Sequence, residues 1–310
     1  MDIPGDYTMT REEALSFLRD VLMIESAVSK LQSDKPIFLD ELITAMGHHI
    51  PYQTVKGIAT HPDNRILPTA SDIKRDITSK VGGLCYQLNI FCWMLLRALD
   101  FDAFLISGDY MHYKDQHVMM IIDSLTGNGS KHFFDVGLGY PTLQLIPLDF
   151  EQESPVYFDS YMRYRFVRQG TKVLTLQLSV ETNPAQAYHV KPEYICDGWI
   201  SFIFIYVDHP VTISHFNNSM TDIFTVADPE NCYLTSLRCL TYPNGRLTCI
   251  KDSKLLLEDE EHRVQVTLFR SRDEVLDAFV RYFPQLPVDM VKTAIKDFEF
   301  AFERKKNVNL

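Results

Sequence analysis

Apolar residues recur at three- and four-residue steps from Thr10 to Leu99, which predicts a mostly helical N-terminal part. The stretch "TREEALSFLRDVLMI" opens with the capping-box residues Thr10 and Glu13, and "PIFLDELITAMGHHI" has Pro36 near its start. "SDIKRDITSK" predicts a third helix with Ser71 as its N-cap. A fourth helix is expected from about Cys85 to Leu99.

From Asp102 to about Val207 the period shortens to that of strands, and Gly, Asn, Asp and Pro separate the segments. Short strands in succession predict an antiparallel barrel or sandwich. The predicted strands are "DAFLISGDY", "HVMMIID", "KHFFDVGLG", "RYRFVRQ", "TKVLTLQLSV" and "WISFIFIYV".

The last third of the chain mixes both periods. "RLTCIKDSKLLLE" and "HRVQVTLFR" predict paired strands, and Ser271 with Glu274 predicts a second capping box before "SRDEVLDAFVRYF". "VDMVKTAIKDFEFAFERKK" predicts a final helix. Helices first, strands second and a mixed end indicate the α+β fold class.

Charge and cysteine content narrow the function. The 310 residues have a formal net charge of -11 and no basic tract, which argues against nucleic acid or an anionic membrane as the main partner. The N-terminus lacks the features of a secretory signal, and no stretch approaches the length of a transmembrane helix. The six cysteines match no zinc pattern, so we expect free thiols, no metal and a cytoplasmic location.

Cys85 has an unusual setting, because it follows Gly82 and Gly83 and stands at the start of an apolar helix. Glycines permit a tight turn, and the free N–H groups and dipole of a helix start stabilise a thiolate. The same N–H groups can hold an oxyanion. A buried, inert cysteine near a helix start is the alternative, and Cys92, inside the apolar pattern, is interpreted as core.

A thiol nucleophile works best with a histidine that takes its proton and a carboxylate that orients the histidine. His117 begins the strand "HVMMIID", and Asp135 precedes a Gly-x-Gly in "FFDVGLG". His112 and His132 compete as the base, and Asp123 competes as the carboxylate. Spacing alone does not choose among these residues.

Three stretches in order, "GGLCYQLN", "HVMMIID" and "FFDVGLGYP", resemble the signature stretches of the arylamine N-acetyltransferases. "IPYQTVKGI", "DIFTVADPENCYLTS" and "NGRLTCI" extend the resemblance over most of the chain. It implies a helical bundle over residues 1–100 that carries Cys85, a β-barrel over 101–209 that carries His117 and Asp135, and an α/β lid over 210–310. The core would be of the Cys-His-Asp type found in cysteine proteases and transglutaminases.

By this resemblance, Cys85 is the nucleophile, His117 the general base and Asp135 the residue that orients it. The implied reaction is ping-pong transfer of an acetyl group from acetyl-CoA to an arylamine, hydrazine or similar acceptor, as in xenobiotic metabolism, by a monomer. Gly83, Gln87 and Asn89 match positions that support the site. Leu138 and Tyr140 match the loop that lines the acceptor pocket. The simpler alternative for Gln87 and Asn89 is helix packing and capping, and for Leu138 it is neutral repacking.

The sequence departs from the family pattern at two paired positions. Val81 replaces the arginine before Gly-Gly, and Gln53 stands where the family has glutamate. Loss of both residues is consistent with a lost ion pair, since either one buried alone would be costly. Leu138 replaces a phenylalanine, which favours a different acceptor.

Two other functions remain open at this stage. One is another Cys-His-Asp acyl transfer, of the transglutaminase or peptidase kind, which would use a peptide amide in place of a CoA thioester. The other is a weakened or non-catalytic relative that binds acyl-CoA or aromatic ligands. The departures at Val81 and Gln53 favour the second, and the intact Cys85, His117 and Asp135 weigh against it.

Overall fold

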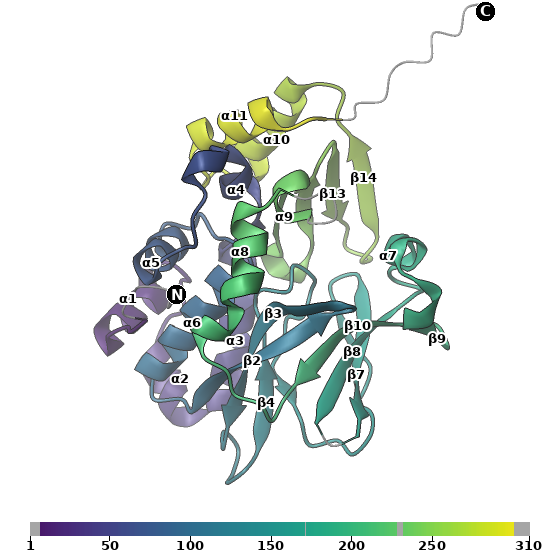
Figure 1. Ribbon diagram of the computed structural model, residues 1–310. Helices are drawn as coiled ribbons and strands as arrows, with labels where there is room; N and C mark the ends of the chain where they lie inside the picture. The colour runs from purple at the N-terminus through teal and green to yellow at the C-terminus, as the bar shows by residue number, and fades with distance from the viewer. Residues whose placement is uncertain (1–6, 171, 228–231, 301–310) are drawn as a thin grey trace, which may run out of the picture.

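The computed structural model describes residues 7–170, 172–227 and 232–300, and it confirms the mixed α+β fold class (Figure 1). Helices come first along the chain, and strands dominate after Ala103. The helices of the N-terminal part are α1 (Arg11–Asp20), α2 (Ala27–Ser33), α3 (Lys35–His49), α4 (Val55–Ala59), η1 (Pro62–Asn64), α5 (Ala70–Thr78) and α6 (Cys85–Ala98).

The larger sheet is antiparallel and has nine strands, in the order β5-β4-β3-β2-β10-β8-β7-β6, with β9 paired to β10. The order has two ends, so the described strands form a curled half-barrel and not the closed barrel that the sequence suggested. Its end strands are two and three residues long, and such short edge strands present few free backbone groups for further pairing. The strands are β2 (Ala103–Tyr110), β3 (Tyr113–Asp123), β4 (Lys131–Phe134), β5 (Ile146–Pro147), β6 (Tyr157–Asp159), β7 (Met162–Gln169), β8 (Val173–Ser179), β9 (Ile195–Cys196) and β10 (Trp199–Tyr206).

A second, five-stranded antiparallel sheet has the order β1-β11-β12-β13-β14. Its first strand, β1 (Tyr52–Gln53), comes from the helical part of the chain, which the division of the sequence into three successive segments did not predict. The other strands are β11 (Arg238–Thr241), β12 (Thr248–Lys251), β13 (Lys254–Glu258) and β14 (Val264–Leu268), which confirm the paired strands expected there.

The remaining helices connect and cover the two sheets. In Figure 1, α10 and α11 lie together with α4 at one end of the molecule, and α8 lies in front of α6. These helices are α7 (Pro184–His189), η2 (Pro192–Tyr194), η3 (Ile213–Phe216), α8 (Asn217–Thr225), α9 (Cys232–Thr235), η4 (Pro243–Gly245), α10 (Arg272–Tyr282) and α11 (Val288–Asp297).

Strand β3 separates two hydrophobic cores. Val118, Met120 and Ile122 pack in the core shared with the N-terminal helices, whereas Met119 and Ile121 pack in the core enclosed by the curled sheet. Successive side chains of a strand point to opposite faces, so a strand buried on both faces is apolar throughout. This explains why "VMMII" is a continuous apolar run.

One predicted N-cap and one predicted capping box differ from the structure. Thr69, not Ser71, is the N-cap of α5, and it forms a reciprocal capping box with Asp72. Ser271 caps α10 as expected, but the Glu274 carboxylate accepts the N–H of Arg270, at 2.7 Å, so the predicted second capping box is wrong. A side chain at N3 reaches whichever N–H the turn presents, which the spacing alone does not reveal.

The final helix is shorter than predicted. It ends at Asp297, and Phe298 has an extended backbone. The Arg272 guanidinium donates to the carbonyls of Lys296 and Phe298, at 3.1 and 3.0 Å, and thereby satisfies carbonyls at this helix end. The rest of the predicted helix, residues 301–306, lies outside the described residues.

Candidate active site

Cys85 is the first residue of α6 and is 2% exposed. Gly82 has φ +76°, and a Cβ atom there would lie 1.9 Å from the carbonyl oxygen of Pro51. No other residue type fits such a close approach at a positive φ. The first glycine is therefore required by the turn that delivers Cys85 to the helix start.

Strand β1 fixes this turn to the smaller sheet. The Gly83 N–H donates to the Pro51 carbonyl at 3.1 Å, and the Gln53 N–H donates to the Gly83 carbonyl at 3.0 Å. Tyr52 and Gln53 in turn pair with Leu240 and Cys239 of β11. The segment before Cys85 is thus connected through β1 to the C-terminal part of the chain.

His117 and Asp135 form a buried hydrogen-bonded pair. His117 Nε2 lies 2.6 Å from Asp135 Oδ2, and the two residues are 5% and 3% exposed. The register Met120 opposite Phe134 puts Asp135 one residue beyond β4, beside the start of the apolar run of β3. Two adjacent antiparallel strands bring the pair together, as the sequence suggested.

The competing candidates lie elsewhere. His112 is exposed and its ring packs on Tyr113, at 4.1 Å between ring centroids. His132 lies on β4, where it pairs with Ile122 of β3. The Asp123 carboxylate accepts the N–H of Ser124 at 2.8 Å. In the described structure, none of these three residues contacts Cys85.

The charges around His117 favour its protonated form. Burial by itself would lower the pKa of His117, but the hydrogen-bonded Asp135 carboxylate and then the neighbouring Cys85 raise it to about 10. The Cys85 Sγ also lies 3.9 Å from the carbonyl oxygen of Gln116. By contrast, burial raises the pKa of the Cys92 thiol well above its usual range, as expected for a core cysteine.

Asn89 links helix α6 to Asp135. Its amide nitrogen donates to Asp135 Oδ1 at 2.8 Å and to the Val118 carbonyl at 2.7 Å, while its oxygen accepts the Val136 N–H at 3.0 Å. Asn89 is fully buried, and these bonds satisfy its amide group. The residue therefore holds α6, β3 and the Asp135 loop in one arrangement.

Gln87 and two glycines complete the packing. Gln87 Oε1 accepts the N–H of Leu84 at 2.9 Å, and a Cβ atom on Gly83 would lie 2.3 Å from the same oxygen. A Cβ atom on Gly137 would lie 2.7 Å from the Cα of Cys85. The loop after Asp135 thus packs directly on the backbone of Cys85.

A cavity of about 130 Å³ opens onto Cys85 and His117. An apolar cavity of roughly 150 Å³ accommodates benzene, so this one has room for about one aromatic ring. Leu138 and Tyr140, expected in the acceptor pocket, both line it. Its other lining residues are Tyr52, Tyr110, Gln116, Gly137, Phe202, Ile203, Cys232, Tyr233, Arg238 and Lys251.

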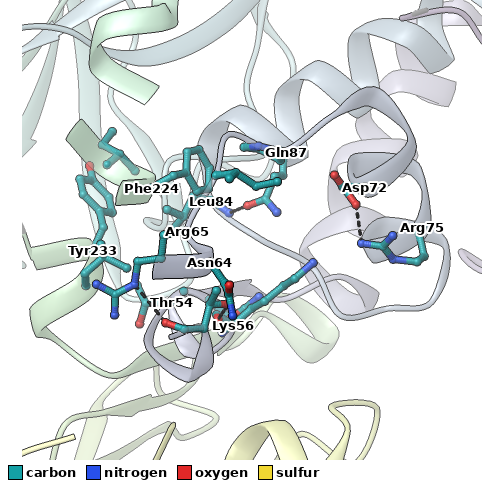
Figure 2. A pocket seen from close by; sticks show the side chains of 17 residues that line it. Thr54, Lys56, Asn64, Arg65, Asp72, Arg75, Leu84, Gln87, Phe224 and Tyr233 are labelled. Carbon is teal, nitrogen blue, oxygen red and sulfur yellow. Dashed lines mark hydrogen bonds and ion pairs between the residues drawn. The ribbon is translucent and has the colours of Figure 1, made fainter. Parts of the chain in front are cut away.

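A second cavity, of about 250 Å³, also has Tyr233 in its wall (Figure 2). Lys56, Asn64 and Arg65 lie along one side of it, and Leu84, Phe224 and Tyr233 supply apolar surface. Asp72 and Arg75 form an ion pair of 2.7 Å at its margin. Neither Cys85 nor His117 lines this cavity, so the smaller one is the candidate active site.

Among the residues described, no group of three or more His, Cys, Asp or Glu side chains is arranged to hold a metal ion. No helix in the same part of the chain combines the length and apolar character needed to cross a membrane.

Comparison with known proteins identifies the family. The sequence profile of a family described as N-acetyltransferase matches residues 38–291, most of the chain. The chain belongs to the arylamine N-acetyltransferase family. Its members are acyltransferases.

Solved arylamine N-acetyltransferases share the fold. The M. smegmatis enzyme is 17% identical with a TM-score of 0.71, covering 91% of this chain and 97% of its own. The Salmonella typhimurium enzyme is 14% identical with a TM-score of 0.72, covering 94% and 100%. The Mycobacterium marinum enzyme, solved in complex with CoA, is 15% identical with a TM-score of 0.71, covering 92% and 100%. No curated protein sequence matches the chain.

In this member of the arylamine N-acetyltransferase family, the two residues that differ from the family pattern, Val81 and Gln53, are buried and uncharged. Val81 packs with Val55 and Ile58 in the core of the smaller sheet. Gln53 is 2% exposed, and its oxygen accepts the Lys56 N–H at 2.9 Å. An apolar contact and a neutral hydrogen bond thus occupy the two positions.

Several residues that line the candidate active-site cavity were not expected from the sequence, among them Tyr233, Arg238 and Lys251. Arg238 interrupts the apolar segment "SLRCL", and Lys251 ends the segment "LTCIK". A charged residue inside a strand pattern is the signal that would have drawn attention to Arg238.

Proposed function

We propose that this protein transfers an acetyl group from acetyl-CoA to an aromatic amine or hydrazine, through a thioester on Cys85. The observation that carries the proposal is the position of Cys85 and His117 at one cavity of about 130 Å³, with Asp135 hydrogen-bonded to His117 at 2.6 Å. Family membership and the CoA complex of the M. marinum enzyme support acetyl-CoA as the donor.

In the first half-reaction, the Cys85 thiolate attacks the thioester carbonyl carbon of acetyl-CoA. The new C–S bond forms, the bond from this carbon to the CoA sulfur breaks, and His117 gives the leaving thiolate its proton. Asp135 holds the imidazole in orientation. The N–H groups of Cys85 and Tyr86, which lie in the first turn of α6, stabilise the oxyanion.

In the second half-reaction, the amine nitrogen attacks the carbonyl carbon of the acetyl-Cys85 thioester. A C–N bond forms, the C–S bond breaks, and the proton of the amine passes to His117. Leu138 and Tyr140 contact the aromatic ring of the acceptor in this proposal, because both line the cavity beside the thiol.

Intact-protein mass spectrometry tests the proposal. The native protein is mixed with acetyl-CoA without acceptor, and one acetyl adduct is expected that disappears on adding an arylamine. Cys232 lines the same cavity, so Cys232→Ser is the matched control and keeps the adduct, whereas Cys85→Ala loses it. If folded native protein forms no adduct, the proposal is wrong and the binding-protein alternative is favoured.

We also propose that the protein works as a monomer in the reducing cytoplasm. All six cysteines are free thiols, which supports a reducing compartment. Light scattering coupled to gel filtration tests the oligomeric state, and a mass near 35.9 kDa is the expected result.

A further inference from the structure

Two cations face each other at the active-site cavity. Arg238 on β11 and Lys251 on β12 are directly opposite in the strand pairing, and both line the cavity with Cys85 and His117. No aspartate or glutamate of the described chain lines it. Like charges directly opposite on paired strands destabilise a sheet, so this pair costs stability where it stands.

The guanidinium of Arg238 is also incompletely satisfied. Its Nε atom is buried and makes no hydrogen bond to any described residue. No ion pair joins Arg238 to a carboxylate within the same residues. A buried donor without a partner costs free energy, and natural proteins keep such costs mainly at functional sites.

The backbone holds Arg238 firmly in this position. Its N–H donates to Thr54 Oγ1 at 2.8 Å, and its carbonyl accepts the Thr54 N–H at 2.9 Å. Thr54 directly follows β1, the strand that fixes the turn before Cys85. The cation and the nucleophile are therefore attached to the same short strand from opposite sides.

The other walls fit an aromatic ring. Tyr140 and Phe202 meet edge to face at 5.0 Å between ring centroids, and both line the cavity beside Tyr52. Burial, followed by the nearby Cys85, raises the pKa of the Tyr52 phenol, which stays neutral. Aromatic walls beside a pair of cations suit a flat ligand that carries a negative group.

Resting on the proposed function, we propose that Arg238 determines specificity by pairing with a carboxylate on one of the two substrates. Guanidinium and carboxylate match as a planar two-bond pair, which a phenol or an ammonium does not reproduce. Lys251 adds positive charge at the same place. The carboxylate is carried either by the aromatic acceptor or by the transferred acyl group.

The test compares matched substrates that differ by one carboxylate. Acceptors are 4-aminobenzoate and 4-aminobenzamide with acetyl-CoA; donors are succinyl-CoA and butyryl-CoA with a neutral arylamine. In one of the two arms, we expect kcat/KM to favour the anionic substrate. Arg238→Gln lowers this preference at least about tenfold, the smaller end of what a charge-assisted hydrogen bond supports.

Controls separate specificity from stability. Arg238→Lys restores part of the preference, and Arg163→Gln, an exposed arginine on β7 paired with Glu181, leaves it unchanged. Calorimetry on folded Cys85→Ala measures binding of 4-aminobenzoate and 4-aminobenzamide without turnover. If the acceptor carries the carboxylate, 4-aminobenzoate binds more tightly than 4-aminobenzamide in this variant. That result does not depend on the acetyl adduct on Cys85, so it tests the role of Arg238 separately from the proposed function.

Three outcomes overturn the inference. The first is an equal loss of kcat/KM for charged and neutral substrates in Arg238→Gln, which indicates a structural role. The second is the absence of any carboxylate preference in the native protein in both arms. The third is a raised KM for acetyl-CoA with no change in preference, which assigns Arg238 to the phosphates of CoA.

Discussion

The amide of Asn89 donates to Asp135 Oδ1 at 2.8 Å, and this bond joins the helix that begins with Cys85 to the carboxylate that is hydrogen-bonded to His117. Asp135 Oδ1 also accepts the Gly137 N–H at 2.8 Å. Its other oxygen is left for His117. Two hydrogen bonds therefore fix Oδ1 of the carboxylate, while Oδ2 bonds to the imidazole.

Asn89→Leu tests this link. The substitution removes the hydrogen bonds that Asn89 donates to the buried Val118 carbonyl and Asp135 carboxylate, so we expect a loss of about 1–3 kcal/mol in the free energy of unfolding. The acylation rate of Cys85 should fall at least about tenfold, because small displacements of reacting groups are costly. Urea unfolding and stopped-flow acylation provide the measurements.

Asn183→Leu is the matched control, because Asn183 is another buried, hydrogen-bonded asparagine and lies in the loop after β8. It should lose stability and keep its acylation rate. In Asn89→Leu the pH profile of acylation should also shift, since Asp135 is released. An unshifted profile with only a stability loss would reduce Asn89 to a packing residue.

Gly137→Ala tests the contact between the Asp135 loop and Cys85. The new methyl group would lie 2.7 Å from the Cα of Cys85 and 2.8 Å from Asn89 Nδ2, and backbone must move to relieve the contact. We expect about 1–3 kcal/mol of overpacking cost and at least about a hundredfold slower acylation.

Gly170→Ala serves as the comparison. A methyl group there meets nothing within 4 Å, but the residue has φ +66°. It should cost about 1–2 kcal/mol of backbone strain and leave acylation unchanged. Normal acylation by Gly137→Ala would contradict this prediction, because it would show that the loop after Asp135 moves to relieve the contact while Cys85 stays in place.

The pH dependence of stability tests the environment of His117. Its pKa is raised to about 10 in the folded protein and is about 6.5 when unfolded, so the folded state holds the proton more tightly. This stabilisation is fully present below about pH 6.5 and is lost as pH rises toward 10. One proton bound only by the folded state gives a slope of about 1.4 kcal/mol per pH unit.

His117→Gln should therefore lose stability relative to the native protein at pH 6.5 and approach it near pH 10. Urea unfolding of both proteins across this range measures the difference, because titrating groups that do not interact with His117 are shared and cancel. A constant difference between the two proteins would contradict the raised pKa.

A double-mutant cycle tests whether Gln53 and Val81 replace an ion pair of the family pattern. Gln53→Glu and Val81→Arg each place a charge in a buried, uncharged position, and each alone should destabilise the protein. If the two positions once held an ion pair, the double variant should be more stable than the sum predicts, by about 0.5–3 kcal/mol. Denaturant unfolding of all four proteins measures this coupling, and purely additive losses would reject it.

The sequence by itself determined the local features. The α+β class, helix α6 with Cys85 at its first residue, the strand that contains His117 and the strand that ends just before Asp135 followed from period, glycine positions and motif order, although β3 begins at Tyr113 and not at His117. These features depend on neighbours in the chain, and the required turn geometry at Gly82 is one of them. Helix ends were less predictable, because Arg272 of another helix satisfies the last carbonyls of α11.

Only the tertiary structure decided which histidine meets which carboxylate, since the register of β3 and β4 selects His117 and Asp135 over His132 and Asp123. It also placed β1 in the C-terminal sheet and so brought Arg238 to the cavity of Cys85. More than 150 residues separate these two in the sequence. Contacts at such a separation arise from packing of whole sheets, which no local pattern of residues encodes.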